Sequence, residues 1–185
     1  SSDLKKNLEF ITSQERSALE KALEDLEKAK IGFGSVYASD YITNRLVGDS
    51  LGTYDPYLRI LKIDRDDGKK GAIFSYSAHA TCFGHNQKNL SGDYPSRVIS
   101  LLEKNDIVDF AVYGAGAVGS MSPRTRAREG ERKVREVSDG LYEFAVSGLR
   151  NIGGKYEFML HSERVDIEMR EDRKSTRLNS SHQII

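Results

Sequence analysis

Three segments of the sequence combine residue types that can bind a metal or attack a carbonyl group. In the first, Phe74-Ser75-Tyr76-Ser77-Ala78-His79, a histidine emerges just as an apolar strand ends. Ligands often lie where a strand of a rigid sheet ends, so His79 is a candidate metal ligand through a neutral ring nitrogen. The alternative is a histidine at the edge of the core, bonded to backbone. Cys82 has no second ligand pair to join it, which argues against a zinc-finger type of site, and His85 is expected at the surface.

The second segment is Ser91-Gly92-Asp93-Tyr94-Pro95. Proline is tolerated at the first helical position, so a helix is expected to start here. Asp93 either caps that helix by accepting backbone N–H bonds or orients a neighbouring histidine such as His79.

The third segment, Gly114 to Pro123, has the G-x-G-x-x-G spacing of dinucleotide-binding loops in Gly114, Gly116 and Gly119. In that motif a helix begins within the glycines, and Pro123 would break its second turn. The alternative is a tight loop in which Gly116 lets the backbone approach a ligand closely and Ser122 is presented as a nucleophile or hydrogen-bonding group. The dinucleotide-binding module stays open as a competing hypothesis.

The elements that must position these segments alternate between helix and strand. Periodic apolar residues predict helices at 13–29, 95–103 and 129–150. Strands are predicted at 31–37, 57–63, 71–77 and 107–113, with a final strand pair at 156–160 and 165–169. The run 107–113 is almost continuously apolar, which is typical of a strand covered on both faces. Loops are expected at 38–56, 79–94 and 114–123.

The predicted fold class is therefore α/β, a layered domain with a mixed β-sheet flanked by helices. The signal Arg65-Asp66-Asp67-Gly68 predicts a hairpin between two of the strands, so the sheet is not purely parallel. A chain of 185 residues suits one domain.

Composition narrows the range of partners. Lys+Arg and Asp+Glu both number 28, so no global field favours nucleic acid or an anionic membrane. No apolar run approaches the roughly 18 residues of a membrane span. The balance favours a small or neutral substrate, and the oligomeric state is left open.

Both ends of the sequence invite an expectation. The chain starts Ser-Ser-Asp, without Met or a signal-peptide core, and we expect its start to be missing. Residues 172–182 resemble one reading frame of a common short-read sequencing adapter. We expect residues 172–185 to belong to no domain, which removes His182 from the candidate ligands and leaves 1–171 as an incomplete fragment.

The order of these segments resembles the N-terminal catalytic region of neutral/alkaline, non-lysosomal ceramidases. That family has an apolar strand ending in His-x-Thr, then Ser-x-Asp, then a Gly-rich stretch ending Gly-Asp-x-Ser-Pro. The matching residues here are His79 with Thr81, Ser91 with Asp93, and Gly119 to Pro123. Upstream, Asn44-Arg45 resembles the family's Asn-Arg element, and Tyr54-Asp55-Pro56 to Asp67-Gly68-Lys69 resembles its hairpin. The similarity spans roughly residues 30–125.

The resemblance implies a zinc-dependent amidohydrolase that cleaves ceramide, or a related N-acyl lipid, to a fatty acid and a sphingoid base. It implies one Zn²⁺ held by two His, a Glu and a Tyr, with His79 as the second histidine. Ser122 matches the active-site serine, and Arg45, Asp93 and Gly116 are expected near the substrate. Relatives are commonly secreted, periplasmic or membrane-associated.

Two departures from the family pattern matter. No upstream His-x-His segment precedes Ile31, and the Glu and Tyr ligands would lie downstream of Glu171. The zinc site is therefore expected to be incomplete and the fragment inactive, because closed zinc sites need three or four ligands. Ser120 also stands where the family usually has Asp. A family member that has lost catalysis is a further alternative.

Overall fold

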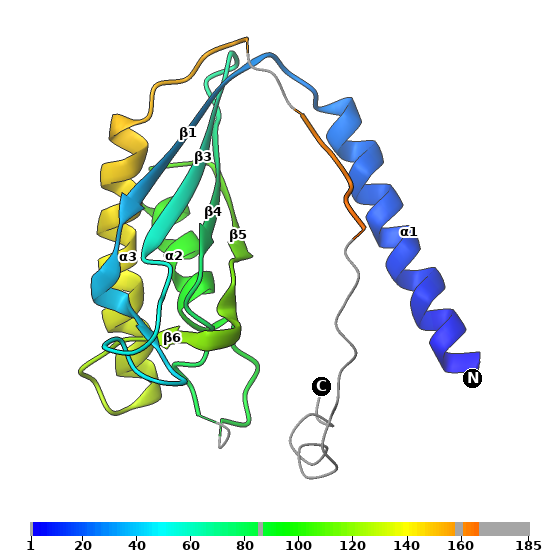
Figure 1. Ribbon diagram of the computed structural model, residues 1–185. Coiled ribbons are helices and arrows are strands. Elements are labelled where there is room, and N and C mark those ends of the chain that lie inside the picture. The colour runs from blue at the N-terminus through cyan, green and yellow to red at the C-terminus, as the bar shows by residue number, and fades with distance from the viewer. Residues whose placement is uncertain (1, 85–86, 158–160, 167–185) are drawn as a thin grey trace.

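The computed structural model describes residues 2–84, 87–157 and 161–166. Four strands form one mixed sheet, and two helices cover one of its faces (Figure 1). This confirms the predicted layered α/β class. The elements, in chain order, are α1 (Ser2–Glu24), β1 (Ala29–Tyr37), a 3₁₀ turn (Ser39–Tyr41), β2 (Ile42–Asn44), β3 (Tyr57–Arg65), β4 (Lys70–Tyr76), α2 (Asp93–Lys104), β5 (Phe110–Ala115), a second 3₁₀ turn (Val118–Ser120), β6 (Met121–Pro123) and α3 (Gly130–Asn151).

The strand order in this sheet is β1-β3-β4-β5. β1 and β3 pair antiparallel, as do β3 and β4, whereas β4 and β5 are parallel. The parallel pair requires a crossover connection, and α2 supplies it. The predicted hairpin is the β3–β4 connection, where Gly68 adopts φ +91°, a left-handed conformation that glycine takes without a steric penalty.

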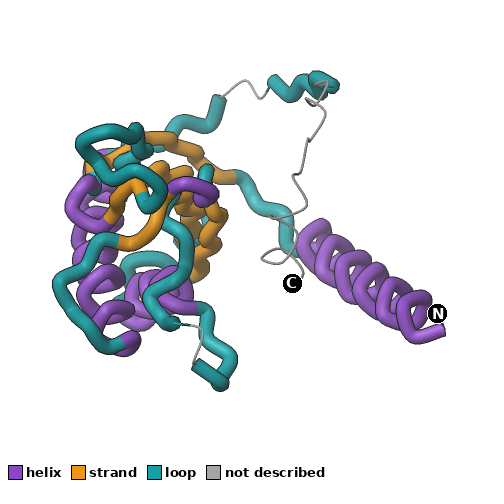
Figure 2. The backbone as a smooth tube through the Cα atoms, turned by 60° about the horizontal axis from the view of Figure 1, so that its bottom comes forward, coloured by secondary structure: helices purple, strands orange, loops and turns teal. Residues whose placement is uncertain are grey.

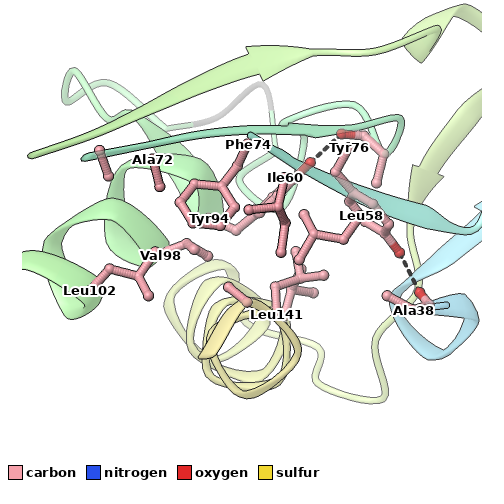
Figure 3. Close-up of a cluster of buried hydrophobic side chains, with 14 of the residues drawn as sticks. Ala38, Leu58, Ile60, Ala72, Phe74, Tyr76, Tyr94, Val98, Leu102 and Leu141 are labelled. Carbon is pink, nitrogen blue, oxygen red and sulfur yellow. Dashed lines mark hydrogen bonds between the residues drawn. The ribbon is translucent and has the colours of Figure 1, made fainter. Parts of the chain in front are cut away.

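The core lies between the sheet and the two helices α2 and α3. Side chains from alternate positions of β3 and β4 point to the helices, which is the period-2 pattern of a strand. Figure 3 shows Leu58, Ile60 and Phe74 facing Tyr94 from α2 and Leu141 from α3. All five are at most 2% exposed. The hydroxyl of Tyr76 donates to the carbonyl oxygen of Ala38 (2.6 Å), which joins the end of β4 to the end of β1.

Two short strands, which the sequence predicts as loops, form a separate antiparallel ribbon. β2 pairs with β6 in the register Ile42↔Pro123, Thr43↔Ser122 and Asn44↔Met121. The ribbon lies at the end of the main sheet below β1 and β5 in Figure 1. Its residues come from the predicted loops 38–56 and 114–123, so those two predictions are wrong in part.

Other boundaries also differ from the predictions. The first helix begins at Ser2 and ends at Glu24, and Ala29 belongs to β1 instead. The prediction that residues 107–113 are covered on both faces is wrong for the described chain, because Phe110 is 64% exposed and Val112 is 39% exposed. Residues 156–157 and 161–166 form no strand, and the rest of the predicted final strand pair lies outside the described residues, as do His85 and the segment 172–185.

Helix α1 stands apart from the rest of the described chain. In Figures 1 and 2 it leaves the start of β1 and extends clear of the sheet and of the helices α2 and α3. No described helix is both long enough and apolar enough to cross a membrane.

Candidate functional site

The β2–β6 ribbon sorts its side chains by face. Directly paired residues of an antiparallel ladder share a face, and successive residues alternate between faces. Ile42 and Met121 are buried on one face. Thr43 and Ser122 are half-buried on the other, which makes that face the polar one. Ser122 is thus presented by a strand rather than by a free loop.

Backbone hydrogen bonds extend the ribbon at both ends. The N–H of Arg124 donates to the carbonyl oxygen of Tyr41 (3.1 Å), and the N–H of Arg45 donates to that of Ser120 (2.9 Å). By the same alternation, Arg45 and Arg124 flank Ser122 on the polar face. Pro123 lies between hydrogen-bonded pairs, where a residue without an N–H fits the ladder.

The guanidinium of Arg45 holds the loop before β6. Its Nε and a terminal nitrogen donate to the carbonyl oxygen of Gly119 at 3.0 and 2.7 Å. Both bonds span 74 positions of the sequence. Arg45 thereby fixes the chain three residues before Ser122.

His79 lies on the other edge of β6. Its backbone N–H donates to the carbonyl oxygen of Met121 (3.3 Å), the residue directly before Ser122. The structure therefore brings the backbones of three predicted site residues, Arg45, His79 and Ser122, to one short strand. The imidazole Nδ1 of His79 is buried and has no hydrogen-bond partner among the described residues.

Two tyrosines, the buried Tyr94 and the partly buried Tyr113, fix the strand end from which His79 emerges. The hydroxyl of Tyr94 bonds to the carbonyl oxygen of Ala78 and lies 2.7 Å from the hydroxyl of Tyr113. The Tyr113 hydroxyl in turn donates to the carbonyl oxygen of Tyr76 (2.9 Å). Burial raises the pKa of Tyr113 to about 12 and that of Tyr94 further. Both phenols stay neutral donors at ordinary pH, so the residues on either side of Ser77 are held in place.

Gly116 has a packing role. Its N–H donates to the carbonyl oxygen of Tyr76 (3.0 Å). A Cβ at this position would lie 2.4 Å from the Ser77 hydroxyl oxygen, so only glycine fits without displacement. The close approach predicted for Gly116 is made to the protein itself, whereas its predicted contact with a substrate stays a prediction.

Asp55 is a residue that the sequence placed only in a hairpin motif. Its carboxylate accepts hydrogen bonds from the Ser77 hydroxyl (2.9 Å) and from the Arg59 guanidinium (2.6 and 3.2 Å). Burial raises the pKa of Asp55, but the hydrogen bonds from Arg59 and Ser77 together outweigh it and hold the pKa below its usual value. The carboxylate is ionised, and its bond to Ser77 fixes the position two residues before His79.

Asn44 and Asp49 organise the loop beside Arg45. The amide oxygen of Asn44 accepts from the N–H groups of Leu46 (3.0 Å) and Val47 (3.1 Å). Asp49 accepts from the Thr43 hydroxyl (2.9 Å) and the Asn44 N–H (2.7 Å), and it pairs with Arg124. Sequence analysis did not find Asp49, because one aspartate in a polar loop carries no pattern.

Asp93 has a structural role at the start of α2. Its carboxylate accepts hydrogen bonds from the N–H groups of Tyr94 (2.7 Å) and Phe83 (3.1 Å). It is 8% exposed and adopts φ 54°. The predicted acceptor role at the helix start fits these bonds, although Asp93 is the first residue of α2 and Gly92 takes the cap position. The bonds also tie the loop after His79 to the helix.

The glycine motif does not have the geometry of a dinucleotide-binding loop. There a helix begins within the glycines and its N-terminus faces the pyrophosphate. Here β5 is followed by a 3₁₀ turn at Val118–Ser120 and then by β6. The next α-helix starts only at Gly130. This arrangement speaks against the dinucleotide hypothesis.

The residues present can supply only part of a zinc site. His79 offers a buried ring nitrogen that has no hydrogen-bond partner in the described part of the chain, which suits a metal ligand. Across residues 2–84, 87–157 and 161–166, no group of three or more His, Cys, Asp or Glu side chains could hold a metal ion. Cys82 is buried and its pKa is raised by burial, which leaves it a protonated thiol. The described chain fits one ligand of such a site and not a whole site.

The fold just described is similar to that of ceramidases. One solved match is the neutral ceramidase from Pseudomonas aeruginosa, with a TM-score of 0.60 and 19% identity over 72% of this chain and 24% of that one. Another is a ceramidase in complex with C2, with a TM-score of 0.61 and 20% identity over 71% of this chain and 24% of that one. The chain thus spans about a quarter of the length of these two ceramidases. No family model and no curated protein matches the sequence.

Proposed function

We propose that this chain is part of a zinc-dependent hydrolase that cleaves the N-acyl amide bond of ceramide or a related lipid, releasing a fatty acid and a sphingoid base. The observation that carries the proposal is the convergence of Arg45, His79 and Ser122 on the strand β6. The ceramidase-like fold supports a relationship to hydrolases. Residues 1–171 would form part of the catalytic domain, and the parent protein would be secreted, periplasmic or membrane-associated.

The chain's own residues have distinct roles in this proposal. Ser122 would offer its hydroxyl to the amide, as a nucleophile or as a hydrogen-bond donor to the developing oxyanion. Arg45, on the same ribbon face, would lie near the amide carbonyl. Because each guanidinium has five donors, Arg45 can bond to Gly119 and still donate to a substrate. Asp93 and Gly116 would also form part of the substrate site.

One zinc ion would be coordinated by His79 together with another His, a Glu and a Tyr from outside the described residues. When bound, a zinc ion acts as a Lewis acid toward a carbonyl and lowers the pKa of water to about 7. A single histidine cannot retain the ion against water, so the 185-residue chain should not bind zinc by itself. The substrate of the complete site would be an uncharged lipid amide rather than a nucleic acid.

The proposal is tested first on the purified chain. Elemental analysis should find zinc far below one equivalent, and no ceramide hydrolysis should be seen. The full gene should then supply a His-x-His segment upstream and the Glu and Tyr downstream. Stoichiometric zinc in the 185-residue chain would contradict the incomplete site.

In the complete protein, two substitutions should separate metal binding from chemistry. His79→Ala should lose zinc and activity together, whereas Ser122→Ala should keep zinc and lose activity. The control is Ser35→Ala, a serine exposed on β1, which should change neither. A His79→Ala protein that still binds one equivalent of zinc would contradict the assignment of His79 as a ligand.

A further inference from the structure

The face of the main sheet opposite α2 and α3 is apolar and uncovered in the described chain (Figure 1). Its residues line up in rows that follow the strand register. One row runs Phe33↔Leu61↔Ile73↔Val112, and the next runs Ile31↔Ile63↔Gly71↔Phe110. We call the seven apolar side chains of these rows the open face: Ile31, Phe33, Leu61, Ile63, Ile73, Phe110 and Val112.

The side chains of the open face are more exposed than a contiguous group of large apolar side chains normally is in a folded domain. Phe33 is 71% exposed, Phe110 is 64% exposed and Ile73 is 44% exposed. A contiguous apolar patch of this kind marks a surface that another element covers.

Helix α1 carries a matching surface. Leu4, Leu8 and Ile11 recur at spacings of four and three, and Ala18, Leu19 and Ala22 continue the same side of the helix, interrupted by the charged residue Glu15. Leu4, Leu8 and Leu19 are 70%, 63% and 61% exposed. Helices in proteins owe most of their stability to the packing of an apolar face, so the apolar side of this 23-residue helix is expected to have a partner.

The connection between α1 and β1 is short and anchored. Only residues 25–28 separate the two elements. The Arg65 guanidinium, at the end of β3, bonds to the Asp25 carboxylate (2.9 Å), and the N–H of Asp66 donates to the carbonyl oxygen of Lys28 (2.9 Å). In Figure 1, α1 descends from this anchor to the right of β5, while α3 lies at the left. A rotation about residues 25–28 would bring α1 over the open face.

We propose that α1 folds back antiparallel to β1 and covers the open face, which completes a three-layer arrangement with helices on both sides of the sheet. The lengths agree, because the stripe from Leu4 to Ala22 spans about 27 Å at 1.5 Å per residue and β1 spans about 30 Å at 3.3 Å per residue. In this position Leu19 lies over the row that contains Ile31 and Ile63.

The chain's own helix is favoured over a second copy as the occupant of the open face. A segment tethered by four residues has an effective concentration in the millimolar range, which is far above the concentration of protein in an ordinary experiment. Short loops of two to six residues are also the usual connection between a helix and the strand it packs on.

Chemical cross-linking tests the contact. The variant Leu19→Cys with Ile63→Cys places one thiol on the stripe and one on the open face. The matched control, Lys21→Cys with Ile63→Cys, moves the helix thiol to the opposite side of the same turn. Cys82 is buried and its thiol has a raised pKa, so it is a poor target for a maleimide. A short bismaleimide should link the first pair within one chain roughly tenfold faster than the control pair, because the tether gives both pairs a high effective concentration but only the first pair faces across the contact.

A second measurement follows the amide hydrogen exchange of α1. In the unmodified chain α1 should exchange slowly, and Ile73→Lys, which places a charge in the open face, should speed exchange in α1 while α3 stays protected. Equal cross-linking rates for the two pairs would overturn the proposal. So would cross-links that form only between chains and vanish on dilution, since these would assign the open face to a second copy. Fast exchange in α1 of the unmodified chain would also contradict it.

Discussion

The backbone N–H of His79 donates to the carbonyl oxygen of Met121 (3.3 Å), and this bond joins the end of the main sheet to the β2–β6 ribbon. It places His79 beside Met121, the residue directly before Ser122. A displacement of β6 therefore moves the candidate nucleophile and the candidate ligand relative to each other. The groups that hold β6 in place are open to test without any knowledge of the substrate.

The first prediction concerns the glycine at the end of β5. Gly116→Ala should destabilise the chain by about 1–3 kcal/mol, because the new Cβ overlaps the hydroxyl oxygen of the fully buried Ser77. Chemical denaturation measures this loss. The control is Gly119→Ala, where nothing lies within 4 Å of the added Cβ and little change is expected. Equal effects of the two substitutions would show that the close approach at Gly116 is not required.

The second prediction concerns Arg45. Arg45→Ala should lower stability by roughly 1 kcal/mol, since two charge-assisted hydrogen bonds are lost at an exposed position. It should also increase amide hydrogen exchange at Ser120 and at the first two residues of β6, Met121 and Ser122. Arg45→Lys keeps the charge but not the planar pair of donors, so it should restore only part of the protection. If Arg45→Ala leaves exchange in β6 unchanged, Arg45 does not hold this loop.

The third prediction is a pH dependence set by Asp55. Its pKa is lowered in the folded chain, so its contribution to stability is complete above the unfolded pKa of about 3.9 and is lost as the pH falls through the folded pKa. Asp55→Asn should lower stability at neutral pH and flatten the fall in stability on acidification below about pH 4. Urea denaturation at several pH values checks this. Asp139→Asn, at a carboxylate that is 59% exposed, serves as the control. An acid limb unchanged by Asp55→Asn would contradict the role.

Long elements with a clear period could be predicted from the sequence. The β3–β4 hairpin follows from alternation on both sides of Asp67-Gly68, and α3 from an apolar stripe of 3.6-residue period. The ribbon could not be predicted. β2 and β6 have three residues each and pair across nearly 80 positions of the chain, so neither has a period to detect.

The candidate site shows the same division. His79 could be found because a histidine at the end of an apolar strand is a recognisable position. Ser122 could be found as a candidate because it lies in a glycine-rich loop before a proline, whereas Arg45 was found only through the order of motifs. Asp49 bonds to Arg124 and Asp55 bonds to Ser77, and because only folding brings these partners near, neither bond could be predicted from the spacing of residues in the sequence.

The fourth prediction concerns the tyrosine under the strand end. Tyr94→Phe removes the hydroxyl that bonds to the Ala78 carbonyl and to Tyr113, and it leaves a buried acceptor unpaired. Leaving a buried polar group without a partner costs about 1–3 kcal/mol, so the chain should lose that much stability. The control is Tyr37→Phe, at an exposed ring, where a change below about 0.5 kcal/mol is expected.

The consequence of Tyr94→Phe should reach His79. With the Ala78 carbonyl released, the backbone of residues 77–79 gains freedom, and the bond from His79 to Met121 weakens. Nuclear magnetic resonance should show altered amide and imidazole shifts for His79 in Tyr94→Phe and not in Tyr37→Phe. If the His79 signals are unaltered while the chain loses the expected stability, Tyr94 stabilises the core and does not position His79. Altered signals would make Tyr94 a positioning residue for the histidine.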